Sequence, residues 1–193
     1  MNGSRFYFDL GSPLSYVVAE RINGLFAEAE IGVPEWKPVL AAGLDCDAAA
    51  PEETKAAAER AASAAGLPPI RWPGSWPFDS TDAMVAATFA KQIGRTVAFS
   101  LAAFRQAFAG GQDLGSLDGI LIAGAACELH PRALSGAIER ESIREALANE
   151  TEAARSGGIR QLPAIETGGR VIHGYDEIIA TLTTAAANTV ENQ

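Results

Sequence analysis

The sequence predicts an α/β fold in which a strand–helix–strand unit opens the chain and two strands and a helix close it. Three patterns support this prediction. Residues 5–10 alternate in polarity, as in a strand, and the following stretch repeats its apolar side chains at helical spacing. After the second predicted strand, over residues 34–40, short strand patterns return only after residue 161. The stretch between them is helical in pattern, so the order is β-α-β, helices, β-β-α.

The opening unit has clear start and stop signals. Ser12 and Pro13 begin the first helix, because serine is a preferred cap and proline fits the first helical turn. Apolar residues continue at helical spacing until Gly32. A second strand is predicted over residues 34–40, where Pro38 cannot donate a hydrogen bond to a neighbouring strand.

The middle of the chain is predicted to be mostly helical. A helix covers residues 51–65, and four prolines make residues 67–78 a stiff loop that carries Trp72 and Trp76. Residues 80–156 follow as several helices, the last over residues 135–156. The expected joints are Gly94, Gly110–Gly111 and His130–Pro131.

The end of the chain has a hairpin pattern. Short strands over residues 162–166 and 170–173 are joined by a Thr-Gly-Gly turn, and a final helix begins near residue 174 and frays from residue 188. This order suggests a thioredoxin-like fold with an all-helical insertion, although other mixed sheets also fit the pattern. The thioredoxin-like domain would cover residues 1–77 and 157–193, and the insertion residues 78–156.

Composition excludes several classes of protein. The 193 residues carry 15 basic and 24 acidic side chains, a net charge of −9, which argues against nucleic acid and anionic membranes as partners. A local basic pocket for an anionic substrate stays open. No apolar stretch has the length of a membrane span, and the first residues lack the apolar core of a secretory signal, so the cytoplasm is the expected location.

The two cysteines do not predict a disulfide or a metal site. Cys46 and Cys127 form no Cys-x-x-Cys motif, and with only two histidines in the chain a zinc site is not expected. Both are expected to be buried or half-buried thiols. The alternative is that one of them is a lone redox thiol.

Ser12 lies where a strand turns into a helix, a place that favours negative charge. An ordinary helix cap explains it equally well. Ser12 and Ser15 have the spacing of the Cys-x-x-Cys pair of thioredoxin-fold redox proteins. Since neither carries sulfur, disulfide exchange by this motif is excluded.

The run FYFDLGSPLSY, residues 6–16, resembles the opening of 2-hydroxychromene-2-carboxylate isomerases and kappa-class glutathione transferases, within the DsbA-like superfamily. The segments GIRQLPA, residues 158–164, and GYD, residues 174–176, extend the resemblance over nearly the whole chain. It implies a DsbA-like fold, glutathione as cofactor, a small aromatic-derived substrate and a homodimer.

The resemblance also implies roles for matching residues. Ser12 would be the catalytic serine, donating to the sulfur of glutathione, and Pro163 the cis-proline facing it. The main chain of Leu162 would pair with the tripeptide as an added strand. Asp176, preceded by Tyr175, would hold the γ-glutamyl amine. From the residues alone, Leu162-Pro163 is as readily an extended dipeptide and Asp176 a helix cap.

Four further residues are weaker candidates for a substrate pocket. Ser15, Tyr16, Trp72 and Trp76 lie near the site residues in the expected fold, and packing is the competing explanation for each. His173, close to the closing motif, is expected to be a half-buried strand residue. No metal ligands are expected.

A serine hydroxyl does not ionise near neutral pH, but it donates to a thiolate that a cofactor supplies. That bond lowers the pKa of the bound thiol from its free value of about 8.5. We therefore hypothesise an isomerase of the chromene-carboxylate type that uses glutathione or another low-molecular-weight thiol. The alternatives are a kappa-like transferase and a redox-inactive DsbA-like protein that binds a peptide or another ligand.

Overall fold

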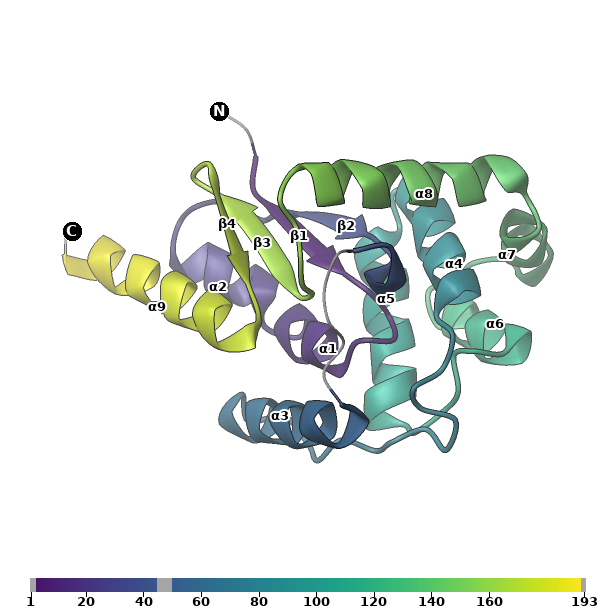
Figure 1. Cartoon of the computed structure of the whole chain (residues 1–193), viewed down its shortest axis with the longest axis horizontal. Coiled ribbons are helices and arrows are strands. Elements are labelled where there is room, and N and C mark those ends of the chain that lie inside the picture. The colour runs from purple at the N-terminus through teal and green to yellow at the C-terminus, as the bar shows by residue number, and fades with distance from the viewer. Residues whose placement is uncertain (1–2, 45–49, 192–193) are drawn as a thin grey trace.

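A computed structural model describes residues 3–44 and 50–191 of the chain. Within these residues one sheet has the strand order β2-β1-β3-β4 (Figure 1). Strand β1 pairs in parallel with β2 and antiparallel with β3, and β3 pairs antiparallel with β4. The strands are β1 (Arg5–Phe8), β2 (Glu35–Pro38), β3 (Ala164–Thr167) and β4 (Arg170–His173). The chain has the predicted α/β, thioredoxin-like fold.

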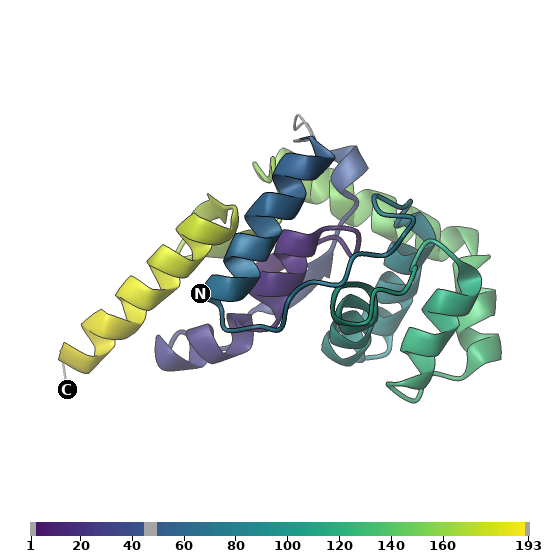
Figure 2. The same ribbon diagram turned by 90° about the horizontal axis from the view of Figure 1, so that it is seen from below.

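Helices surround the sheet, and those over residues 81–156 form a helical block beside it. Figure 2 shows α3 and α9 on one side of the molecule and the helices of the block on the other. The helices are α1 (Pro13–Ala19), α2 (Ile22–Glu28), α3 (Pro51–Ala64), α4 (Thr81–Gln92), α5 (Thr96–Phe104), α6 (Leu117–Ala125), α7 (Pro131–Ile138), α8 (Glu141–Ser156) and α9 (Tyr175–Glu191). A π-helical segment (Arg105–Ala109) continues α5, and a 3-10 turn (Ala41–Gly43) follows β2. Treating α4–α8 as an insertion remains a prediction.

The two faces of β1 enter different apolar clusters, as the alternation of its side chains requires. Phe6 and Phe8 are fully buried in the main core, where both rings meet Trp36 of β2 at centroid distances of 5.1 and 5.6 Å. Tyr7 and Ala164 belong to a smaller cluster on the opposite face. The sheet is therefore covered on both sides.

The predicted first helix is two helices. α1 ends at Ala19 and α2 begins at Ile22, whereas the apolar spacing predicted one uninterrupted helix. The N–H of Arg21 bonds to the carbonyl of Val18, three residues back, which tightens the turn. The new direction buries Ile22 and Phe26 completely. Core packing decides this break, because no glycine or proline marks it.

Other boundaries also differ from the prediction. The last helical piece divides into α7 and α8 at Arg140, whose backbone is extended. β3 begins at Ala164 and not at residue 162, because Pro163 has no N–H for the ladder. α9 continues to Glu191, and the hydroxyl of Thr189 donates to the carbonyl of Ala29 at 3.4 Å. The joints at Gly94, Gly110–Gly111 and His130–Pro131 and the loop over 67–78 are confirmed.

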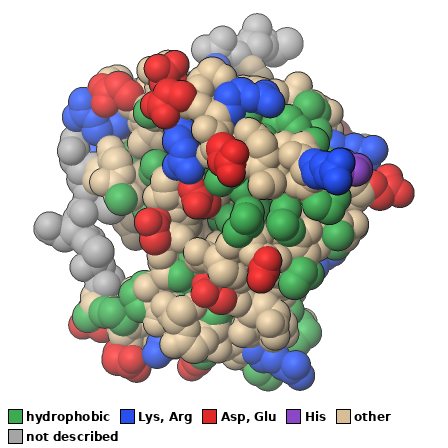
Figure 3. Space-filling model, turned by 90° about the vertical axis from the view of Figure 1, so that its right-hand side faces the viewer, with side chains coloured by type: hydrophobic (Ala, Val, Ile, Leu, Met, Phe, Trp, Pro, Cys, Tyr) green, Lys and Arg blue, Asp and Glu red, His purple; other side chains and the backbone are tan. Residues whose placement is uncertain are grey.

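The outer face of the helical block carries a mixed surface. Figure 3 shows acidic and basic side chains interspersed there with apolar ones. The large exposed apolar residues of the block are Ile93, Val97, Leu117 and Ile122. This face therefore presents no continuous basic field. Among the described residues no helix is both long and apolar enough to cross a bilayer.

Glu150 joins three elements and gives a test of the packing. Its carboxylate on α8 lies 2.7 Å from Nζ of Lys91 on α4 and 3.2 Å from Nζ of Lys37 on β2. Burial raises the pKa of Glu150, but the hydrogen bonds and charges of Lys91 and Lys37 outweigh it, so that the pKa is lowered.

Glu150→Gln is expected to lower the free energy of unfolding by about 1 kcal/mol at neutral pH. A lowered carboxyl pKa stabilises the fold above the unfolded-state value and loses this effect as pH falls through the folded-state value. The difference between variant and parent should therefore shrink below about pH 4.5 in denaturant unfolding. Glu145→Gln, on the exposed face of the same helix, is the matched control. A difference that is constant with pH would contradict the assignment.

Candidate functional site

Two adjoining cavities lie beside the start of α1. The larger has a volume of about 910 Å³ and the smaller about 500 Å³. Leu14, Ala57, Arg60 and Gln161 line both, so the cavities share a wall. Together they place residues from the opening and closing units of the chain around one space.

Ser12 lies in the wall of the larger cavity. It caps α1, and its Oγ accepts from the N–H of Ser15 at 3.2 Å. Its own hydroxyl hydrogen has no acceptor within the described part of the chain, so it is free to donate. α1 has only seven residues, so the hydroxyl and not the helix dipole is the main group offered to an anion.

The backbone N–H groups just before Ser12 are already engaged. The N–H of Leu10 donates to Sδ of Met84 at 3.1 Å, that of Gly11 to Oδ1 of Asp9 at 2.8 Å, and that of Ser12 to the carbonyl of Asp9 at 3.0 Å. Burial raises the pKa of Asp9, and the hydrogen bonds from Ala41, Gly11 and Ser80 offset this only in part. The turn is thus rigid and leaves the serine hydroxyl as its free donor.

The main chain of Leu162 is available in the wall of the same cavity. Leu162 lines the larger cavity, and neither its N–H nor its C=O has a partner among the described residues. The Leu162–Pro163 peptide bond is cis, and the carbonyl of Pro163 accepts from the N–H of Gly174 at 2.8 Å. An extended ligand therefore finds unpaired main-chain groups in the cavity that Ser12 also lines.

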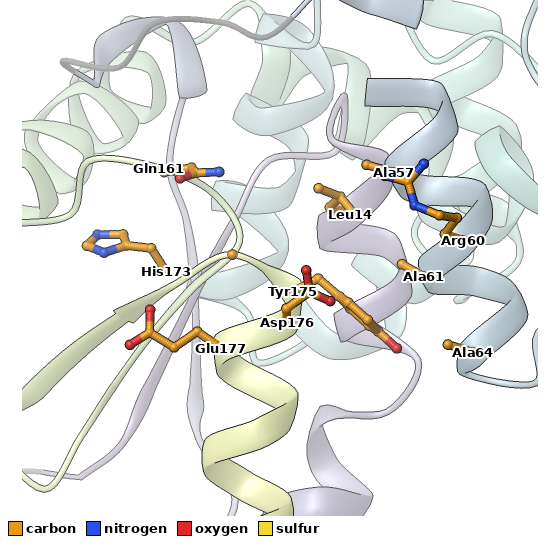
Figure 4. A pocket seen from close by; sticks show the side chains of 11 residues that line it. Leu14, Ala57, Arg60, Ala61, Ala64, Gln161, His173, Tyr175, Asp176 and Glu177 are labelled. Atoms are coloured by element: carbon orange, nitrogen blue, oxygen red, sulfur yellow. The ribbon is translucent and has the colours of Figure 1, made fainter. Parts of the chain in front are cut away.

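The smaller cavity combines charged and polar side chains with the apolar surface of Leu14 and of alanines on α3. Figure 4 shows Arg60 on α3 and Asp176 at the start of α9 on opposite sides of it, with Gln161 and His173 at a third side. The guanidinium of Arg60 has no ion pair or hydrogen bond within the described residues. Nε2 of His173 accepts from the N–H of Arg160 at 3.1 Å. One unpaired cation, Arg60, thus shares the lining of this cavity with two carboxylates, those of Asp176 and Glu177.

The larger cavity has apolar walls but is not basic. Leu40, Trp76 and Phe78 supply apolar surface. Of the charged side chains described in its wall, Arg60 is the one cation, while Asp9, Glu53 and Asp79 carry carboxyl groups. The basic pocket that the composition left open is therefore not found in the described lining.

Some of the predicted site residues line the cavities and others do not. Ser12, Leu162, Tyr175, Asp176 and Trp76 line the cavities. Pro163 follows Leu162 but is not itself a lining residue.

Three weaker candidates are placed elsewhere. Ser15 is fully buried and its hydroxyl has no partner in the described structure, and Tyr16 packs against Phe108 at 5.7 Å between ring centroids. The ring of Trp72 packs against that of Trp76 with 54° between their planes, and its Nε1 donates to Glu59 at 2.9 Å. These three side chains do not line either cavity, because each one packs in the core or against neighbouring aromatic rings.

Arg60 and Gln161 were missed by sequence reasoning. Arg60 lies three residues after Ala57 and four residues before Ala64 on α3. This helix faces α1 through alanines. A single long cation among alanines was the available signal. Gln161 directly precedes the Leu162-Pro163 pair, and no sequence signal marked it as a cavity residue.

Cys127 does not line either described cavity. Cys46 lies outside the described residues. Cys127 is 8% exposed, and burial raises the pKa of its thiol. Among the described residues, no group of three or more potential metal ligands comes together.

Comparison with known proteins places these features in context. The family model of the DSBA-like thioredoxin domain matches residues 5–184. No curated protein matches the sequence.

Similar solved structures include an isomerase and redox proteins. A 2-hydroxychromene-2-carboxylate isomerase aligns with a TM-score of 0.83 and 15% identity, over 98% of this chain and 97% of that one. A probable DsbA oxidoreductase from Streptomyces coelicolor aligns with 0.71 and 14%, over 98% and 90%. The cytosolic disulfide reductase DsbM from Pseudomonas aeruginosa, with GSH, aligns with 0.68 and 14%, over 98% of both chains. At these identities the likeness shows the fold alone.

Replacing Ser12 by alanine tests its role as a cap. Ser12→Ala is expected to lower the free energy of unfolding by about 1 kcal/mol, because the N–H of Ser15 loses its acceptor. Ser12→Thr, which keeps a hydroxyl, serves as the control in denaturant unfolding. Equal stability of the alanine variant and the parent would show that the 3.2 Å contact does not stabilise the helix.

Proposed function

The chain belongs to the DsbA-like thioredoxin family, and on this premise we propose that it is a glutathione-dependent isomerase of the 2-hydroxychromene-2-carboxylate isomerase type. Its substrates would be small intermediates of aromatic degradation. One observation carries the proposal: the start of α1 presents a serine hydroxyl that is free to donate, in a cavity beside the unpaired main chain of Leu162.

The residues around the two cavities fit a tripeptide thiol. The free N–H and C=O of Leu162 suit an extended peptide, which they would bind as an added strand. Asp176 suits an amine and Arg60 a carboxylate, and both face the smaller cavity. Ser12 in the larger cavity is left for the sulfur. The charged end of the thiol would thus meet the charged groups of the smaller cavity, and its reactive end the larger, more apolar one.

Bound glutathione would supply a nucleophilic thiolate for addition to a conjugated carbon of the substrate. Ser12 would stabilise the anionic sulfur by one charge-assisted hydrogen bond, worth about 1.5–3 kcal/mol. This bond lowers the pKa of the thiol and so raises the thiolate fraction at neutral pH. The apolar surfaces of Leu40, Trp76 and Phe78 would hold an aromatic ring and exclude water.

Two other functions use the same residues. A kappa-like transferase would leave the thiol attached to an electrophile, and a ligand-binding protein would use the Leu162 main chain without chemistry. Disulfide exchange, the activity of the DsbM neighbour, is not available to the Ser12–Ser15 pair, since neither has sulfur.

Titration calorimetry tests the central step. Glutathione is expected to bind the parent with saturable heat, and Ser12→Ala is expected to raise the pKa of the bound thiol by about one to two units, since its donor is lost. The thiolate absorbance of the complex, followed against pH, gives this value. Absence of saturable heat with glutathione and with other small thiols would refute the enzyme proposal. Binding with an unchanged thiol pKa would make the hydroxyl purely structural.

Arg60 gives a second test of thiol binding. Arg60→Ala should weaken glutathione binding about tenfold, because an exposed charge-assisted contact to a carboxylate is lost, and Arg60→Lys should recover part of it. Arg71→Ala is the control, since this exposed arginine does not line either cavity. The same loss in both alanine variants would indicate a general effect of net charge and contradict the assignment.

A further inference from the structure

Both ends of Gly11, the residue before Ser12, are held by side chains. Its N–H donates to Oδ1 of Asp9 at 2.8 Å, and its C=O accepts from Nε1 of Trp76 at 3.1 Å. Trp76 comes from the proline-rich loop, 65 positions further along the chain. The two peptide groups that flank Gly11 are therefore each held by a side chain that does not belong to α1.

Asp9 is itself firmly placed. It is 3% exposed, and its second oxygen accepts from the N–H of Ala41 at 2.8 Å. Ser80, just before α4, lowers the pKa of this carboxyl group, although burial outweighs it. A Cβ on Gly11 would lie 3.3 Å from Cβ of Ser80, so the turn packs closely against that residue. The carboxyl group thus joins the Ser12 turn to two other walls of the larger cavity.

Trp76 is held from its other side. Its ring lies 4.8 Å from that of Trp72, and Nζ of Lys55 lies 5.8 Å from its centroid. The same side chain lines the larger cavity. One indole therefore serves both as cavity wall and as donor to the turn that carries the serine.

We propose that Asp9 and Trp76 are positioning residues that together clamp the two peptide groups on either side of Gly11 and so aim the Ser12 hydroxyl into the larger cavity. The consequence for catalysis rests on the proposed function, but the clamp itself does not. Hydrogen bonds to a charged sulfur depend steeply on alignment, so a displaced hydroxyl loses most of its effect.

Trp76→Phe removes the N–H donor and keeps an aromatic ring. With the proposed isomerase activity, kcat is expected to fall about tenfold with little change in KM, and the pH at which activity appears should rise. Trp72→Phe is the matched control, because the N–H of Trp72 bonds to Glu59 and not to the turn. Equal kinetics of the two variants would overturn the proposal.

A reporter that needs no glutathione separates this inference from the proposed function. In Ser12→Cys protein the pKa of the introduced thiol is read from the pH dependence of its alkylation rate. Adding Trp76→Phe or Asp9→Asn should raise that pKa by about half a unit or more, whereas adding Trp72→Phe should not. If Asp9→Asn does not fold, Trp76→Phe alone decides. An unshifted pKa in the Trp76→Phe protein overturns the clamp even if glutathione binds. A shifted one supports it even if glutathione does not bind.

Discussion

The turn between β1 and α1 is the constraint on which the site depends. Its N–H groups at Leu10, Gly11 and Ser12 are all satisfied inside the protein, by a methionine sulfur and by Asp9. A turn with unpaired donors would bind water or anions through the backbone. Here the donors that precede Ser12 are used inside the protein, and the hydroxyl of Ser12 stays free to donate at the wall of the larger cavity.

This turn also explains why the chain needs its distant segments. Trp76 reaches the turn from the proline-rich loop, Ala41 reaches Asp9 from the segment after β2, and Met84 reaches Leu10 from α4. The closing unit adds the unpaired main chain of Leu162 and the carboxylate of Asp176. The helical block is thus part of the site's architecture through contacts with the opening strand and turn.

Local signals in the sequence were sufficient to predict much of the fold and part of the candidate site. The alternation of residues 5–10, the Ser12-Pro13 start and the Leu162-Pro163 pair each act within a few residues, so fold class and several lining residues could be predicted. The division between α1 and α2 could not, because it follows from where Ile22 and Phe26 find core contacts. Arg60 was missed since its importance comes from which cavities α3 borders.

Position 15 has a consequence for how such scaffolds diversify. A buried hydroxyl without a partner costs free energy, so nothing described around Ser15 favours oxygen over sulfur there. A thiol at this position would give up no hydrogen bond of the described fold, but its larger sulfur would need room in a site that is fully buried. Exchange of oxygen for sulfur there is therefore limited by space and not by hydrogen bonding.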